Sequence, residues 1–145
     1  PAIARGVGER LEKVINLKAY HLVLCDPGIT ASTGNAYKNI DYRLTSKPKD
    51  NIKIGLNERL RGQAFDVRDQ MHNDLEESAC RLYPEIKETK EEMAMLLQRE
   101  VYMTGSGATL FALFSDWENA NKGFERLLDT WAKSKKKMFL SSFNS

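Results

Sequence analysis

The sequence predicts an α+β fold whose elements follow the order β-α-β-β-α-β, and three observations favour it. An apolar block at Tyr20 to Cys25 predicts a buried strand near the start. Helical periodicity dominates the middle of the chain, and two blocks of strand-forming residues then flank the turn Gly105-Ser106-Gly107. With 145 residues, 41% of them hydrophobic, the chain is large enough to build one packed core.

The first strand is followed by turn and cap signals. Asp26-Pro27-Gly28 ends the apolar block, because proline and glycine punctuate regular structure. Ser32 or Thr33 can cap a short helix over Asn35 to Lys38, since a hydroxyl there accepts the unpaired amides of the first turn. The stretch 41–55 is polar and contains Pro48, so we expect it to be irregular.

Helices are predicted from residue 56 onward. The apolar residues with helical spacing are Leu56, Leu60, Ala64 and Phe65 in a first segment, and Leu75, Ala79, Leu82 and Tyr83 in a second. Asn73 followed by Glu76 resembles a capping start for the second segment. Pro84 suits the first turn of a further helix. The inward residues expected for that helix are Ile86, Met93, Leu96 and Leu97.

The last part of the chain returns to strands. Residues 101–104 and 108–114 are rich in strand formers on either side of the glycine turn. Ser115 and Glu118 predict a capping box, and residues 138–140 predict a closing strand. The inward residues of the helix between them are Trp117, Ala120, Phe124, Leu127, Leu128 and Trp131. This order is that of a ferredoxin-like plait with extra helices in the first crossover.

Composition excludes several classes of partner. The 22 Lys and Arg residues against 20 Asp and Glu give a net charge of +2, so no global field attracts nucleic acid or a membrane surface. No apolar stretch approaches the ~20 residues that span a bilayer. Cys25 and Cys80 have no metal-ligand spacing, which indicates free thiols in a reducing compartment and no metal site.

The turn Gly105-Ser106-Gly107 is the first candidate site. Glycines let the backbone approach an anion without a Cβ in the way. Position 110 is Leu and no Gly-Lys-Ser/Thr follows, so the turn is neither a dinucleotide fingerprint nor a P-loop. The alternative is an ordinary hairpin turn.

The second candidate site follows the first strand, at Thr33, Gly34 and Tyr37. A turn after a strand with a capped helix is a common place for ligands, and the Tyr37 ring could stack on a base. The alternative is that Tyr37 packs on the core. His21 and His72 receive no acid–base role, so we expect no catalytic residue in this chain.

Four segments together resemble one family. They are Gly6-Val7-Gly8-Glu9, the stretch from Pro27-Gly28-Ile29 to Tyr37, Asn73-Asp74-Leu75-Glu76 with Tyr83-Pro84-Glu85-Ile86, and residues 103–111. In this order they are similar to the second half of the diphosphocytidyl-methylerythritol kinases of the GHMP superfamily. The match is poor between Asp41 and Met71.

The resemblance implies a bacterial cytoplasmic enzyme that, with ATP and Mg²⁺, phosphorylates a hydroxyl of a cytidine-diphosphate-linked methylerythritol, in non-mevalonate isoprenoid synthesis. It implies that the ATP loop, the catalytic Asp and a substrate-side Lys lie in a preceding kinase domain, so the present residues alone are expected to be inactive. The glycine turn would border phosphates, and Tyr37 would lie against the cytosine.

The boundaries follow from the same resemblance. Residues 1–15 are expected to end the preceding domain or a linker, and residues 16–145 to form the GHMP-type C-terminal domain. Pro1 stands where a new chain would carry Met, so we expect a piece of a longer polypeptide. Two alternatives stay open: the same half of a homoserine- or mevalonate-type kinase, and a freestanding plait that binds RNA or a small ligand.

Overall fold

The computed structural model describes residues 2–5, 7–13, 18–39, 66, 68 and 71–143. The chain divides into two compact units, one made of Pro1–Ala19, Lys47–Met71 and Asn144–Ser145, the other of Tyr20–Ser46 and His72–Phe143. The irregular stretch predicted at 41–55 and the helical spacing predicted at 56–65 lie outside the described residues. All six residues of the two candidate sites belong to the second unit.

The first unit contains a β-hairpin that the sequence did not predict. Strands β1 (Ala2–Arg5) and β2 (Arg10–Lys13) pair antiparallel, with Ala2 opposite Lys13. The second strand reads Arg-Leu-Glu-Lys and carries no alternating apolar pattern, so the usual signal for a strand is missing from it.

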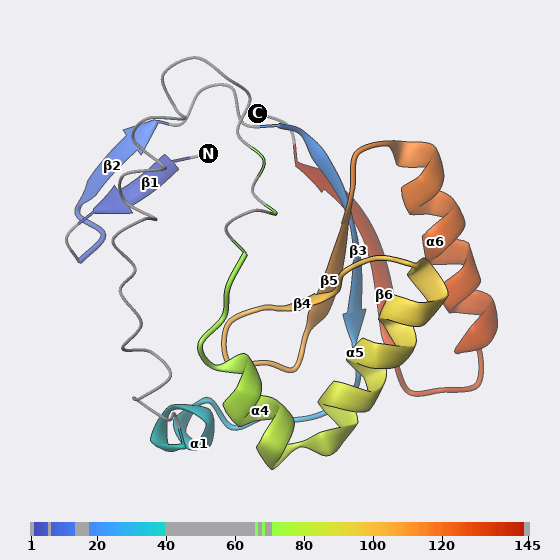
Figure 1. The fold of residues 1–145 in the computed structure, drawn as a ribbon, viewed down its shortest axis with the longest axis horizontal. Helices are drawn as coiled ribbons and strands as arrows, with labels where there is room; N and C mark the ends of the chain where they lie inside the picture. The colour runs from blue at the N-terminus through green and yellow to red at the C-terminus, as the bar shows by residue number, and fades with distance from the viewer. Residues whose placement is uncertain are drawn as a thin grey trace. The chain divides into compact units, whose positions relative to one another are not determined.

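The second unit is built on a four-stranded sheet in the order β4-β5-β3-β6, antiparallel throughout (Figure 1). Its strands are β3 (Tyr20–Asp26), β4 (Tyr102–Met103), β5 (Leu110–Phe114) and β6 (Lys137–Phe143). Its helices are α1 (Thr33–Lys38), α4 (Glu76–Leu82), α5 (Pro84–Leu97) and α6 (Trp117–Thr130). The α+β class is confirmed, and within this unit so is the predicted order of elements, while the ferredoxin-like plait stays a prediction.

The core lies between one face of this sheet and the helices α5 and α6 (Figure 1). Val23 and Cys25 alternate along β3 and lie opposite Ala112 and Leu110 of β5, so these residues share a face. Helices α5 and α6 supply Ile86, Met93, Leu97, Ala120 and Leu127 to the same cluster. Four of the five are fully buried, and Leu97 keeps 7% of its surface.

Two caps differ from the prediction. Helix α6 is capped by Asp116, whose carboxylate accepts the Asn119 N–H at 2.8 Å, and Glu118 pairs with Lys122 instead of closing a box with Ser115. Helix α4 begins at Glu76 without a side-chain cap. In both places a polar residue close to the helix start makes a different contact from the one its spacing suggested.

Three apolar residues that the spacing placed inward are exposed. Leu82 keeps 36% of its surface, Leu128 40% and Trp117 51%. Leu128 is turned away because its neighbour Leu127 occupies the core position. The Trp117 ring instead meets the His21 ring edge-on, with the centroids 5.5 Å apart.

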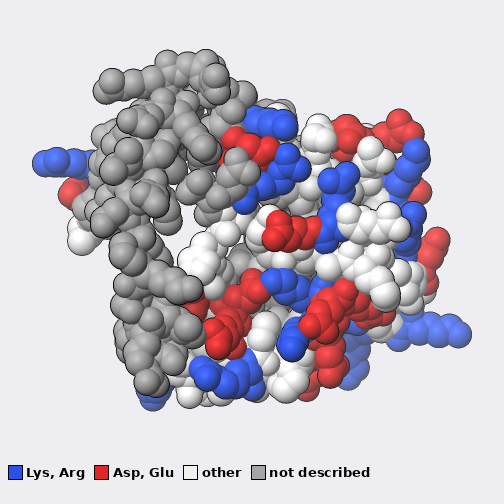
Figure 2. All heavy atoms as spheres, in the orientation of Figure 1, with Lys and Arg blue, Asp and Glu red and all other residues white. Residues whose placement is uncertain are grey.

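The surface charge of the second unit is mixed. Figure 2 shows acidic and basic side chains interspersed over the face formed by α4 and α5. On α5, Lys87 pairs with Glu91 at 3.8 Å, and Glu92 pairs with Lys136, the residue before β6, at 3.1 Å. Of the helices in the described ranges, none has both the length and the apolar character that crossing a bilayer demands.

The connection between β4 and β5 is a tight loop closed by its own backbone. The Thr104 N–H donates to the Thr109 carbonyl at 2.9 Å, and the Gly107 N–H donates to the Thr104 carbonyl at 3.0 Å. Gly105 and Gly107 have φ of +52° and +91°, a region that favours glycine. A Cβ on Gly107 would lie 3.0 Å from the buried Met103 Sδ, whereas a Cβ on Gly105 would meet nothing within 4 Å.

This difference predicts unequal costs for two alanine substitutions. Gly107→Ala should lower the free energy of unfolding by about 2–4 kcal/mol, because backbone strain adds to overpacking. Gly105→Ala should cost only about 1 kcal/mol, from backbone strain alone. Urea denaturation of the two variants measures both values, and equal losses would contradict this account of the loop.

Both cysteines are free thiols, as predicted, and burial controls their protonation. Burial raises the pKa of the Cys25 thiol from 9.0 to about 12, against a smaller opposing effect of the Lys136 ammonium. Burial also raises the pKa of Cys80, with the nearby Glu76 carboxylate acting in the same direction. A thiolate is therefore strongly disfavoured at position 25 in the folded chain.

The raised pKa predicts how stability depends on pH. The unfolded chain loses the Cys25 proton near pH 9 while the folded chain keeps it to about pH 12, so this group weakens folding as pH rises through that window. The slope from Cys25 is at most about 1.4 kcal/mol per pH unit. Denaturation of Cys25→Ala from pH 7 to 11 should show a shallower decline than the parent chain; parallel curves would refute the assignment.

Candidate functional site

The α1 segment is positioned by turn and cap contacts directly after β3. The Gly28 N–H donates to the Asp26 carboxylate at 2.9 Å, which closes the turn at the strand end. The Ser32 hydroxyl accepts the Asn35 N–H at 3.3 Å and caps α1, so the predicted cap is confirmed. Helix α1 begins two residues earlier than predicted, at Thr33.

Tyr37 lies one helical turn beyond Thr33, and positions four apart share one side of a helix. Its ring keeps 54% of its surface exposed. The alternative that Tyr37 packs into the core is therefore wrong; the buried residue of α1 is Ala36. Thr33 and Gly34 are also exposed.

The structure brings the two candidate segments together. The hydroxyls of Thr33 and Ser106 lie 2.9 Å apart, a hydrogen bond between residues that are 73 positions apart in the sequence. Ser106 is the central residue of the glycine turn. Thr33, Gly34 and the turn thus form one continuous region of the surface, with Tyr37 a turn further along α1.

Helix α4 and Tyr83, the residue that follows it, hold α1 in this place through three contacts. The Ser78 hydroxyl donates to the Ala36 carbonyl at 2.9 Å in the interior. Arg81 donates to the Asn39 carbonyl at 2.9 Å, next to the end of α1. The Tyr83 hydroxyl accepts the Ser32 N–H at 3.1 Å at the beginning of α1. Both ends of the short helix are therefore attached to the same neighbour.

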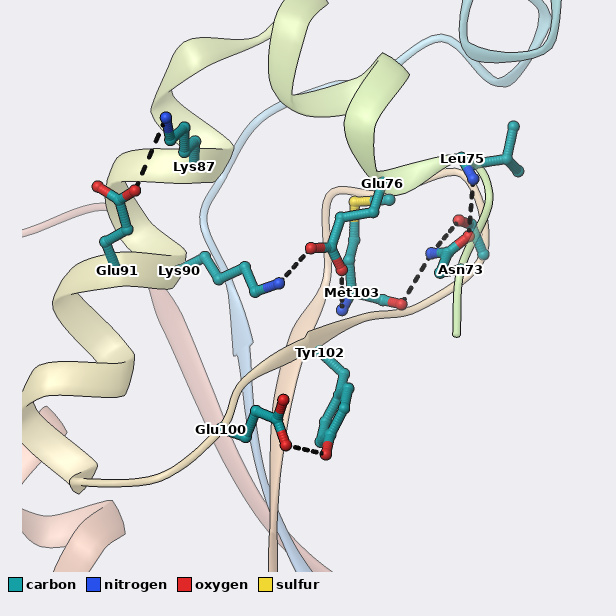
Figure 3. A network of polar contacts seen from close by, with 10 residues as sticks. Asn73, Leu75, Glu76, Lys87, Lys90, Glu91, Glu100, Tyr102 and Met103 are labelled. Carbon is teal, nitrogen blue, oxygen red and sulfur yellow. Dashed lines mark hydrogen bonds and ion pairs between the residues drawn. The ribbon is translucent and has the colours of Figure 1, made fainter. Parts of the chain in front are cut away.

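The start of α4 holds the glycine turn, a role that sequence reasoning missed. Asn73 donates its side-chain amide to the carbonyls of Met103 and Gly105, both at 2.9 Å, and its own side-chain oxygen accepts the Leu75 N–H at 3.1 Å (Figure 3). The Glu76 carboxylate accepts the Met103 N–H at 3.3 Å and pairs with Lys90 of α5. The sequence signal, Asn followed three positions later by Glu, was present but suggested a cap.

The chemistry that these groups offer is binding by neutral donors. One hydroxyl proton of the Thr33–Ser106 pair is used in their mutual bond and the Gly107 N–H is used within the turn, so the other hydroxyl proton and the remaining backbone amides of the turn can donate to phosphate oxygens. In the described part of the chain, no group of three or more His, Cys, Asp and Glu side chains gathers as a metal site would require. His72 does contact Asp74, at 2.6 Å, on the exposed side of the same segment as Asn73.

Comparison with known proteins shows the family of the chain. The family model for the C-terminal domain of GHMP kinases matches residues 59–133, slightly more than half of the chain. The chain is 39% identical over 127 residues to the 4-diphosphocytidyl-2-C-methyl-D-erythritol kinase of Syntrophotalea carbinolica. The aligned region covers 88% of this chain and 43% of that protein. The chain therefore spans less than half the length of this curated relative.

Solved structures give the same fold. A crystal structure of 4-(cytidine 5'-diphospho)-2C-methyl-D-erythritol kinase superposes with a TM-score of 0.69 at 28% identity, over 99% of this chain and 50% of that one. Homoserine kinase from Cytophaga hutchinsonii superposes with a TM-score of 0.66 at 14% identity, over 97% and 47%, which shows the fold alone. The chain belongs to the GHMP kinase family, in which it matches the C-terminal domain.

Proposed function

We propose that this chain is the substrate-side C-terminal domain of a kinase that phosphorylates 4-diphosphocytidyl-2-C-methyl-D-erythritol, with ATP as the phosphoryl donor and Mg²⁺ as its counterion. The observation that carries the proposal is the Thr33–Ser106 hydroxyl contact, which joins the turn suited to phosphate and the helix that presents Tyr37. The name of the relative at 39% identity supplies the substrate class.

The proposed roles follow from the chemistry of each group. One hydroxyl of the Thr33–Ser106 pair donates to the other, so the glycine turn and the remaining hydroxyl proton donate to phosphate oxygens, and the exposed Tyr37 ring stacks on the cytosine. Phosphoryl transfer depends mainly on positioning and charge stabilisation, so a domain that only binds and orients can contribute strongly. The ATP loop, the catalytic Asp and the Lys belong to the preceding domain, of which residues 1–15 are the end or the linker. The free thiols fit a bacterial cytoplasm.

The alternatives have weaker support. A homoserine-type kinase rests on a structural likeness at 14% identity, which carries no substrate information. An RNA-binding plait needs exposed aromatic rings on its central strands. Phe114 of β5 is only 3% exposed and the Arg99 guanidinium lies 4.6 Å from its ring centre, so that ring is not available for stacking. Phe111 of the same strand is half-buried beside the Tyr102 ring of β4, with the centroids 5.6 Å apart.

Replacing Tyr37 tests the substrate assignment. The assay uses an intact kinase made by joining the preceding part of the Syntrophotalea carbinolica enzyme to this chain. Tyr37→Ala should raise the KM for the cytidine substrate roughly tenfold to a hundredfold, because base stacking contributes ~1–3 kcal/mol. The KM for ATP should stay within about threefold, since the ring does not contact that nucleotide in this proposal.

Tyr37→Phe is the matched control, because it keeps the ring and removes only the hydroxyl; its KM for the cytidine substrate should stay near that of the parent. The 145-residue chain alone should give no turnover with ATP, Mg²⁺ and substrate. Turnover by the chain alone, or an equal rise of both KM values in Tyr37→Ala, would contradict the proposed division of roles.

A further inference from the structure

The side chain of Asn73 uses its hydrogen-bonding capacity to connect two elements. A carboxamide has two N–H donors, and both go to the loop, at Met103 and Gly105. Its oxygen accepts the Leu75 N–H at the entrance to α4. The contact to Met103 is half-buried, so water is a poor substitute for the missing donor there.

Glu76 secures the same strand from one turn further on. Its carboxylate accepts the Met103 N–H, so α4 engages both the N–H and the carbonyl of this strand residue (Figure 3). Lys90 of α5 pairs with the other oxygen of Glu76, which keeps the carboxylate in place. The strand end that precedes the glycine turn is therefore fixed, and the contact from Asn73 to Gly105 is the one that acts on the turn itself.

This contact sets the direction of a donor in the turn. The Gly105 carbonyl and the Ser106 N–H belong to one planar peptide unit, in which they point to opposite sides. Because Asn73 holds the carbonyl toward α4, the Ser106 N–H is directed away from α4. Among the described residues this N–H has no acceptor. The Ser106 hydroxyl is meanwhile placed by Thr33.

We propose that Asn73 is a positioning residue: by holding the Gly105 carbonyl it fixes the Ser106 N–H and hydroxyl in the orientation that receives a phosphate of the substrate. The inference rests on the proposed function for the identity of the phosphate, but its structural part concerns this chain alone. In this inference Asn73 affects the alignment of the bound phosphate. The contact with the cytidine comes from α1, and α1 is held by Ser78, Arg81 and Tyr83 without Asn73.

The structural part is tested by backbone NMR of the 145-residue chain. Asn73→Ala removes all three contacts, whereas Asn73→Asp keeps the acceptor for Leu75 and loses both donors to the loop. Both variants should shift the amide signals of residues 105–107, with the signals of α1 little changed. Asn121→Ala, the same truncation on α6, should leave the loop signals unchanged. Unchanged loop signals in Asn73→Asp would overturn the inference, whether or not the proposed function is correct.

The functional part is tested in the joined kinase described above. Both Asn73 variants should lower kcat about tenfold to a hundredfold, because a misplacement of ~1 Å can cost that much, with the KM for the cytidine substrate within about threefold. Asn121→Ala should keep the parent kcat. Activity retained by Asn73→Asp but lost by Asn73→Ala would overturn the inference, because it assigns the residue to the start of α4 alone. An inactive parent would count against the proposed function, whereas the shifts of residues 105–107 in the NMR experiment decide the structural part of the inference separately.

Discussion

The two carbonyl oxygens that accept the amide of Asn73 are the point on which the candidate site depends. Glycines give the β4–β5 turn the freedom to adopt its positive φ angles, and the same freedom means that the turn alone does not select one conformation. Each hydrogen bond contributes about 0.5–1.5 kcal/mol net. The contact to Met103 is half-buried and the contact to Gly105 is exposed, so the side chain of Asn73 favours the conformer in which both carbonyls are paired by about this amount for each bond.

Helix α4 extends this constraint across the site. Its first turn holds the strand end at Met103, and residues 78–83 hold both ends of α1. A helix has a fixed rise of 1.5 Å per residue, so an element attached at both ends keeps its two partners at a set spacing. Helix α4 therefore helps to keep Thr33 and Ser106 in contact, so the contact does not depend on their two hydroxyls alone.

Periodicity and turn chemistry were sufficient to predict the framework of the second unit. The apolar block at 20–25, the helix that starts at Pro84 and the glycine turn all have signals within a few residues, and each element formed where those signals placed it. The predicted helix faces failed at Leu128 and Trp117, because spacing gives the side of a helix but not where the neighbouring layer ends.

The candidate site was predicted only in its parts. Ser32, Thr33 and the glycines carry local signals, whereas the contact of Thr33 with Ser106 joins positions far apart in the chain and has no local signature. For Asn73 the sequence predicted a helix cap and missed the hydrogen bonds to Met103 and Gly105. Its oxygen accepts the Leu75 N–H at the helix start, as its spacing suggested, but its amide also donates to a strand residue 30 positions away, and only the tertiary arrangement supplies that second partner.

In the proposed function, α1 and the glycine turn form one ligand site. The most direct measurement is a titration of the 145-residue chain with cytidine 5'-diphosphate, followed by the backbone amide signals. One site predicts that residues 33–37 and 105–107 shift along a common binding curve, with a single dissociation constant. Shifts confined to one of the two segments, or two curves with different dissociation constants, would contradict it.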